Sequence, residues 1–176
     1  MKQIALEKIN SVPMDAVQLY TDGSRLDGDR SGSVIYIKLR DQEIKIKRRN
    51  PDFCSVFRSE LIAILEGLDS IMSLSRFIDI WIFSDSKSAI QHLIDWHNVR
   101  DSIGADILRK LKHLSLSHRI HFQWIPSHVD IAGNKIADGL ARAEEAITTV
   151  APLTYLEHFS KCKAKNMVIW TVPPVF

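Results

Sequence analysis

The chain has 176 residues, 45% of them hydrophobic and 25% charged, which is typical of one ordinary soluble globular domain. Its net charge of +2 neither demands nor excludes nucleic-acid binding, so a basic surface would have to be local. The two cysteines, Cys54 and Cys162, lack zinc-ligand or CxxC spacing and predict reduced thiols in an intracellular, cytoplasmic or nuclear protein. No secretion signal and no run of about 18 apolar residues occurs, so we expect neither secretion nor a membrane partner.

The first half of the chain predicts a three-stranded antiparallel meander followed by a helix. Residues 1–14 show no clear period. The expected strands are 16–21, 33–39 and 43–47. In the third strand, Ile44 and Ile46 should face the core because side chains alternate between the two faces. A helical apolar stripe then covers 57–73.

The second half predicts alternating strands and helices. The continuous apolar run at 78–83 is typical of a strand covered on both faces, so we expect it to be central and parallel to the first strand. Ser86 should cap the next helix, and Asp101 or Ser102 the one after it. The expected elements are helices at 87–96, 102–116 and 134–147, and a fifth strand at 119–124.

This order of elements predicts an α/β fold. Its sheet would be mixed and five-stranded, with three antiparallel strands followed by parallel ones and with helices on both faces. We expect an N-terminal extension at 1–14, a catalytic domain at 15–147, and a tail or linker at 148–176, where the apolar pattern changes. The tail indicates that the chain is one piece of a longer polypeptide.

Four acidic residues are placed where they can meet. Asp22 and Asp85 lie at or just beyond the ends of two strands, Glu60 lies on the flank of a helix stripe, and Asp138 lies early in the last helix. Four crowded carboxylates repel unless a cation neutralises them. Such oxygen ligands suit Mg²⁺ or Mn²⁺, and two ions about 3.5–4 Å apart can promote hydrolysis of a phosphodiester.

Each candidate also has a simpler interpretation by itself. Asp22 before a glycine is most often a turn former, and Asp85 before a serine is a favourable helix-start carboxylate. Glu60 and Asp138 could be solvated helix residues, and His128 a surface histidine in a loop. These separate interpretations do not predict five features at such coherent places, which favours the joint one.

Four motifs follow one another along the chain. They are Tyr20-Thr21-Asp22-Gly23-Ser24, Ser59-Glu60-Leu61, Ser84-Asp85-Ser86, and the segment from Trp124-Ile125-Pro126-Ser127-His128 through Gly133-Asn134-Lys135-Ile136-Ala137-Asp138. Over roughly 16–147, this set resembles the ribonuclease H type 1 family, and its last segment is most similar to domains attached to non-LTR retrotransposon reverse transcriptases. Any one motif would be a weak signal, whereas the ordered set is specific.

The resemblance implies hydrolysis of the RNA strand of an RNA–DNA hybrid, leaving a 3′-hydroxyl and a 5′-phosphate. The ligands it implies for two Mg²⁺ ions are Asp22, Glu60, Asp85 and Asp138. His128 would assist proton transfer or product release. The implied RNA contacts, which read 2′-hydroxyls in the minor groove, are backbone groups around Gly23, Ser24 and Ser59. It also implies a covalently linked reverse transcriptase as partner.

Four basic residues gather at the end of the meander: Lys45, Lys47, Arg48 and Arg49. They could form a solvated strand face or bind phosphates of the DNA strand. The chain departs from the family pattern in two places. The interval from Asp85 to His128 has no room for a basic helix-and-loop handle, and Asp130 stands where a glycine is expected, so it could disturb the histidine loop.

Two other functions remain open from the sequence. The same architecture serves metal-dependent DNA endonucleases and recombinases, although these usually lack the Trp-x-Pro-x-His loop. A catalytically degenerate nucleic-acid-binding module is the second alternative, and the intact set of acidic residues argues against it.

Overall fold

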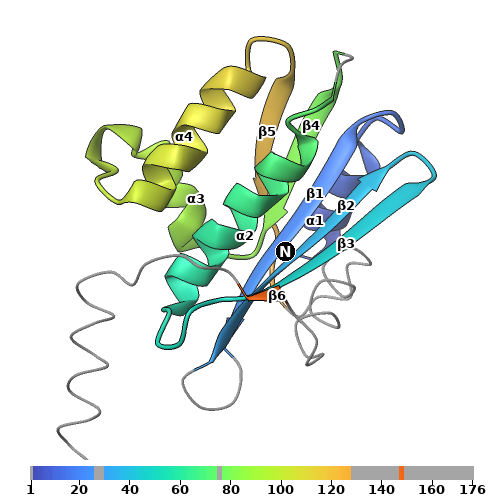
Figure 1. Cartoon of the computed structure of the whole chain (residues 1–176). Coiled ribbons are helices and arrows are strands. Elements are labelled where there is room, and N and C mark those ends of the chain that lie inside the picture. The colour runs from blue at the N-terminus through green and yellow to red at the C-terminus, as the bar shows by residue number, and fades with distance from the viewer. Residues whose placement is uncertain (1, 26–29, 75–76, 128–146, 149–176) are drawn as a thin grey trace, which may run out of the picture.

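The computed structural model describes residues 2–25, 30–74, 77–127 and 147–148, which form a mixed sheet with helices on both faces (Figure 1). The strands are β1 (Val17–Arg25), β2 (Ser31–Leu39), β3 (Gln42–Arg49), β4 (Asp79–Ser84), β5 (Arg119–Trp124) and β6 (Ile147–Thr148), in the order β5-β4-β1-β2-β3-β6. The helices are α1 (Lys2–Asn10), α2 (Val56–Ile71), α3 (Lys87–Ile94) and α4 (Ser102–Leu114), with a 3₁₀ turn, η1 (Trp96–Asn98). None of the described helices is long and apolar enough to cross a membrane.

The five predicted strands and their directions are confirmed. β1 and β3 pair antiparallel with β2, whereas β4 runs parallel to both β1 and β5. The sixth strand was not predicted: Ile147, expected at the end of a helix, lies in β6 and pairs with Arg48 of β3. A two-residue strand leaves no period in the sequence, because pairing with a distant edge defines it.

The predicted helices at 57–73, 87–96 and 102–116 form as α2, α3 and α4, and their caps explain where they begin. The helix predicted at 134–147 lies outside the described residues except for Ile147. Ser55 accepts a hydrogen bond from the Arg58 N–H at the start of α2, and Ser86 does the same for α3 through the Ala89 N–H. Asp101, not Ser102, caps α4 by accepting from the Gly104 N–H at 2.6 Å. Each cap satisfies a backbone donor that the first helical turn leaves without a partner.

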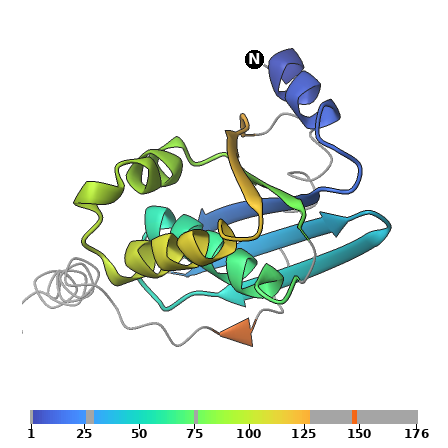
Figure 2. The same cartoon turned by 90° about the horizontal axis from the view of Figure 1, so that it is seen from above.

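The two faces of the sheet carry separate apolar clusters. α2, α3 and α4 cover one face, where Leu19 and Ile82 are fully buried. α1 covers the other face and packs near Tyr20, Tyr36 and Phe83 (Figure 2). The sequence predicted no regular element at 1–14, because the apolar stripe of α1 is short and includes an alanine. Contact with the aromatic face of the sheet stabilises this helix.

The expectation for the third strand is half right. Ile46 packs against the main cluster, but Ile44 is 48% exposed. Ile44 lies toward the β2–β3 turn, which extends beyond the cover of the helices (Figure 1). Alternation sets which face a side chain takes but not how far the neighbouring helix reaches.

The aromatic cluster on the α1 side makes folding sensitive to alkaline pH. Tyr20 stacks on Phe83, with ring centroids 4.8 Å apart, and burial followed by the charge of Tyr36 raises the pKa of Tyr20 to about 12. Since the folded pKa exceeds the usual value of 10.0, the contribution to stability is complete below pH 10 and is lost between pH 10 and 12. We expect the free energy of unfolding in urea to fall by up to about 2 kcal/mol across this window from this group.

The matched variant is Tyr20→Phe, which keeps the ring and cannot ionise. Its stability should fall less steeply between pH 10 and 12 than that of the unmodified protein, because the lysines titrate equally in both. Identical slopes for the two proteins would contradict this assignment.

Candidate active site

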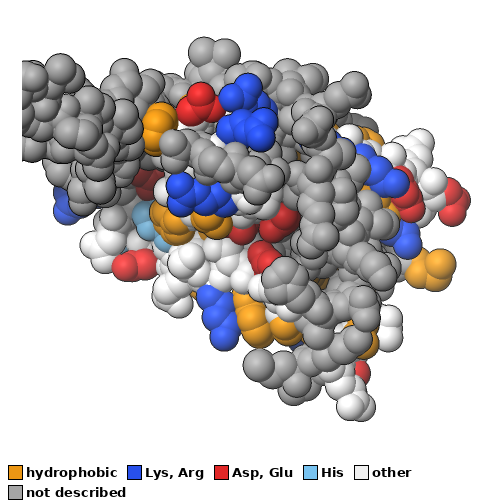
Figure 3. Space-filling model, turned by 90° about the horizontal axis from the view of Figure 1, so that it is seen from below, with side chains coloured by type: hydrophobic (Ala, Val, Ile, Leu, Met, Phe, Trp, Pro, Cys, Tyr) orange, Lys and Arg blue, Asp and Glu red, His pale blue; other side chains and the backbone are white. Residues whose placement is uncertain are grey.

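Three acidic residues from three elements converge at one end of the sheet. Asp22 of β1, Glu60 of α2 and Asp85 after β4 each offer a carboxylate oxygen, and these oxygens lie within 4.8 Å of one another. Asp22 and Glu60 are buried, whereas Asp85 is half-buried and marks the accessible side. Viewed from below, acidic side chains lie among basic and apolar ones on the described surface (Figure 3).

The strand register explains why two of these residues are neighbours. β1 and β4 are parallel, and Thr21 pairs with Ser84. Asp22 and Asp85 follow this last pair, so they lie side by side where β4 ends, as the sequence predicted. The sequence placed Asp22 at the end of its strand, whereas β1 continues to Arg25 and Asp22 still pairs with Val34 of β2.

Glu60 is brought to this pair by close backbone contact between α2 and β1. A Cβ on Gly23 would lie 2.3 Å from the Glu60 nitrogen, so only glycine allows this approach. The hydroxyl of Ser33 donates to the Ser59 carbonyl at 2.6 Å and accepts from the Asn50 side-chain amide at 2.9 Å. Ser33, Asn50 and Ser59 are fully buried, so this network fixes the first turn of α2.

Sequence reasoning missed Ser33 and Asn50 as supporting residues. A signal was present, since Ser33 is a polar residue at the start of the apolar run 34–37 and Asn50 ends the meander before a proline. Their roles depend on partners that lie 17 and 26 residues away from Ser33 in the sequence. Local patterns do not specify such contacts.

The donor set fits a divalent cation. All three groups are carboxylates, the hard oxygen ligands that Mg²⁺ and Mn²⁺ favour. Like charges at this separation repel, and a bound cation converts that repulsion into attraction. Asp22, Glu60 and Asp85 are therefore the residues of the described chain that could hold a metal ion.

The remaining predicted site residues are placed as follows. Asp138, His128 and Asp130 lie outside the described residues, so the structure brings together three of the four predicted ligands. Gly23 is buried against α2, and Ser24, next to it on β1, is half-buried.

Ser59 is a poor candidate for an RNA contact. It is fully buried, its N–H donates to the Ser55 carbonyl at 2.9 Å, and its carbonyl accepts from Ser33. Neither surface nor an available backbone group remains for a substrate, and we exclude Ser59 from the proposed contacts for that reason.

The basic residues of β3 do not form one patch. Arg48 bonds Glu66 of α2 at 3.1 Å and therefore lies on the helix side of the sheet. Lys45, Lys47 and Arg49 take the other side, because successive side chains of a strand alternate. Arg49 also contacts Asp52 at 2.9 Å. The sequence predicted one group of four basic side chains, whereas the pleat of the sheet places Arg48 on the face opposite the other three.

Comparison with known proteins agrees with this geometry. The family model of RNase H matches residues 14–146. A ribonuclease H of Campylobacter jejuni strain 81-176 is 28% identical over 136 residues, covering 73% of this chain and 90% of that protein. A ribonuclease H of Haemophilus influenzae is 24% identical over 152 residues, covering 80% of this chain and 97% of that protein.

A viral protein and a solved structure extend the comparison. The Pol polyprotein of equine infectious anemia virus (isolate 1369) is 26% identical over 148 residues, which cover 80% of this chain and 11% of the polyprotein. The crystal structure of RNase H1 from Halobacterium salinarum NRC-1 shares the fold, with a TM-score of 0.55 at 18% identity, covering 72% of this chain and 94% of that one. The convergent carboxylates, the strand order and the matched family model together lead to one conclusion: the chain belongs to the RNase H family and is an enzyme of the ribonuclease H class.

Proposed function

We propose that this protein hydrolyses the RNA strand of RNA–DNA hybrids with the help of two divalent cations, normally Mg²⁺, for which Mn²⁺ can substitute. The observation that carries the proposal is the meeting of Asp22, Glu60 and Asp85 within 4.8 Å at one end of the sheet. Proteins named ribonuclease H match 73% and 80% of the chain, which supports this choice of reaction.

In this proposal each acidic residue has a defined task. Asp22, Glu60 and Asp85, with Asp138 from outside the described residues, would hold the ions. Bound ions of this kind activate a water and stabilise the leaving oxygen of the phosphodiester. Asp22 and Glu60 are buried, so the surrounding side chains restrict the orientation of their carboxylates. Asp85 is half-buried and would face the substrate. His128 would carry a proton or promote product release.

The proposed substrate contacts come from β1 and β3. Backbone groups at Gly23 and Ser24 would meet the RNA strand, where a 2′-hydroxyl distinguishes RNA from DNA. Lys45, Lys47 and Arg49, on the sheet face opposite Arg48, would contact phosphates of the DNA strand, and each such contact adds to the salt dependence of binding.

We further propose that the chain is the ribonuclease H module of a retroelement polyprotein, linked to a reverse transcriptase. The match to a short part of a retroviral Pol polyprotein supports this context. The bacterial matches cover 90% and 97% of the relatives' own lengths, so a similar domain makes up nearly the whole of those proteins. We therefore expect the chain to be active without a polymerase partner.

The test is a substrate panel under identical conditions. We expect the full chain to cleave a labelled RNA–DNA hybrid in Mg²⁺ or Mn²⁺, to leave duplex DNA and single strands uncut, and to lose activity in chelator. Preferential cleavage of duplex DNA would instead identify a DNA endonuclease or recombinase. Tight hybrid binding with no cleavage in either metal would identify a degenerate binding module.

A further inference from the structure

One tryptophan joins the carboxylate cluster to an exposed cation. Trp124, the last residue of β5, pairs in register with Ser84, and its indole N–H donates to the backbone carbonyl of Asp85 at 2.9 Å. The neighbouring Ile125 N–H donates to the Ser84 carbonyl at 3.0 Å. The end of β5 therefore fixes the backbone that carries Asp85.

The face of the same indole ring contacts a lysine side chain. The Lys87 Nζ lies 4.1 Å from the centroid of the Trp124 ring, and Lys87 is exposed. Lys87 follows Asp85 by two residues, yet no carboxylate in the described part of the chain is ion-paired with it. The cation–π contact places the ammonium over the face of the Trp124 ring.

This placement suits a polyanionic strand. In the proposed function, bound cations offset the charge of the three carboxylates at the cleaved bond. A further positive charge beside the cluster would attract the phosphates that flank this bond. Lys87 supplies such a charge two residues after Asp85, on the tryptophan that binds the Asp85 backbone.

Building on the proposed function, we propose that Lys87 binds a phosphate of the cut strand next to the cleaved bond, and that Trp124 is a positioning residue for both Lys87 and Asp85. The indole N–H sets the Asp85 backbone, and the ring face sets the ammonium. The two tasks use different parts of one side chain, so separate variants distinguish them.

The first variant tests the phosphate contact. Lys87→Gln should raise the KM for hybrid several-fold with kcat within about twofold, and should reduce the slope of log binding constant against log salt by roughly 0.7–0.9. Lys87→Arg should restore the original slope, because it keeps the charge. Binding is measured by fluorescence anisotropy in an Asp85→Asn background, so that it is read without cleavage.

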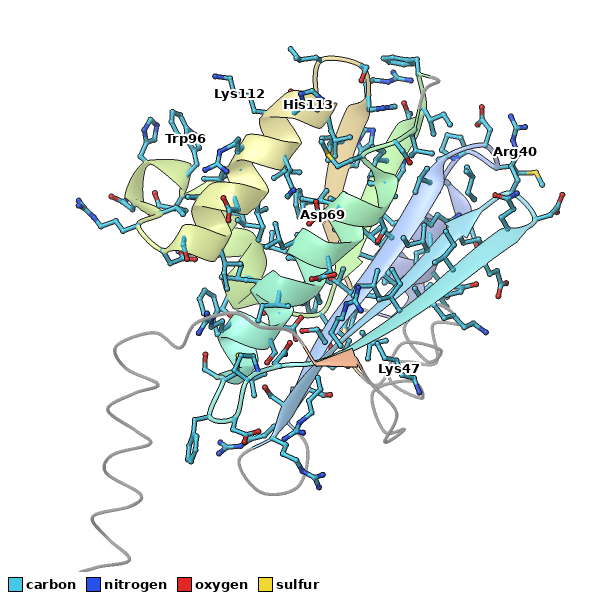
Figure 4. The ribbon with its side chains drawn as sticks, in the orientation of Figure 1. Arg40, Lys47, Asp69, Trp96, Lys112 and His113 are labelled. Carbon is cyan, nitrogen blue, oxygen red and sulfur yellow. The ribbon has the colours of Figure 1, made fainter. Side chains whose placement is uncertain are left out.

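The control is Lys112→Gln, another exposed lysine near the end of α4 (Figure 4). α4 leads into the beginning of β5, whereas Lys87 follows the far end of the parallel strand β4, so the two lysines lie toward opposite ends of the sheet. We expect Lys112→Gln to keep the original slope. An equal loss of slope in both variants would mean a general charge effect and would overturn the assignment of Lys87.

The second variant tests positioning. Trp124→Phe keeps an aromatic face but lacks the N–H donor, so we expect kcat to fall about tenfold and the Mg²⁺ concentration for half-maximal activity to rise, with the salt slope unchanged. A fall in thermal stability with no change in the Mg²⁺ requirement would show a structural role only and would overturn positioning. If the unmodified protein does not cleave hybrid, the proposed function fails. If it cleaves hybrid and Lys87→Gln keeps the original slope, only this inference fails.

Discussion

Replacement of Asp85 by asparagine is expected to lower the kcat/KM for RNA–DNA hybrid by on the order of 10³ or more. A carboxylate that helps hold catalytic cations contributes several kcal/mol to the stabilisation of the transition state, and each 1.36 kcal/mol corresponds to about a factor of ten in rate. Asparagine keeps the shape of the side chain and leaves the backbone carbonyl that accepts from Trp124. The loss should therefore come from the site and not from unfolding.

A stability measurement separates these causes. In chelator, Asp85→Asn should be at least as stable to heat as the unmodified protein, because one of three mutually repelling carboxylates becomes neutral. Added Mg²⁺ or Mn²⁺ should raise the melting temperature of the unmodified protein more than that of the variant, since the cation binds the folded state.

The matched control is Asp106→Asn on α4, where the carboxylate contacts Arg109 in an exposed i,i+3 pair. Such pairs contribute little, so we expect neither cleavage nor cation binding to change. An Asp85→Asn protein that retains a tenth or more of the original activity would refute the assignment of Asp85 as a metal ligand.

Substitution of Gly23 by alanine is the second change with a large expected effect. The added methyl group would lie 2.3 Å from the Glu60 nitrogen and 2.6 Å from the Ser59 carbonyl carbon, and these backbone atoms cannot turn aside. Overpacking of this kind costs about 1–3 kcal/mol, which corresponds to a fall of roughly 5–10 °C in melting temperature at the upper end for a chain of this size. β1 and α2 must move apart, so Asp22 and Glu60 separate.

We therefore expect Gly23→Ala to lose most hybrid cleavage even at temperatures where it is folded. Gly67→Ala is the control, because the same helix contacts the same strand there, but the new methyl group meets the side-chain carbons of Leu19 at 2.8–2.9 Å. This variant should change stability while keeping cleavage where it is folded. Comparable loss of cleavage in both variants would contradict a special role for the approach at Gly23.

β1 to β5 and α2 to α4 were predictable because apolar residues recur in them at a regular spacing, whereas α1 and β6 were not. The alternation in β1 and the apolar run of β4 also predicted that Asp22 and Asp85 would be neighbours, since the two strands are parallel. Glu60 on the flank of the α2 stripe was predicted to lean over the same edge, and it lies there. The roles of Asp138 and His128 remain predictions.

The sequence did not predict the burial and contacts of several side chains, because these depend on which part of one element a neighbouring element covers. Ile44 obeys the period of β3 but lies beyond the helices, and Arg48 lies apart from its basic neighbours because it contacts Glu66. Ser59 belongs to a motif that suggests a substrate contact, yet the packing of α2 on β2 buries it completely. Neither the alternation of side chains along a strand nor the position of a residue in a motif predicts how far that residue is buried.

The sequence by itself determined the family, the order of β1 to β5 and α2 to α4 along the chain, and the three acidic residues that meet, because short segments of the chain specify each of them. The tertiary structure alone decided which face α1 covers, how Ser33 and Asn50 hold the start of α2, and how Trp124 holds Asp85. The hydrogen bonds among these contacts join residues up to 39 positions apart, and the cluster under α1 joins residues farther apart still. Only close packing of the folded chain selects them from the many pairings that the sequence permits.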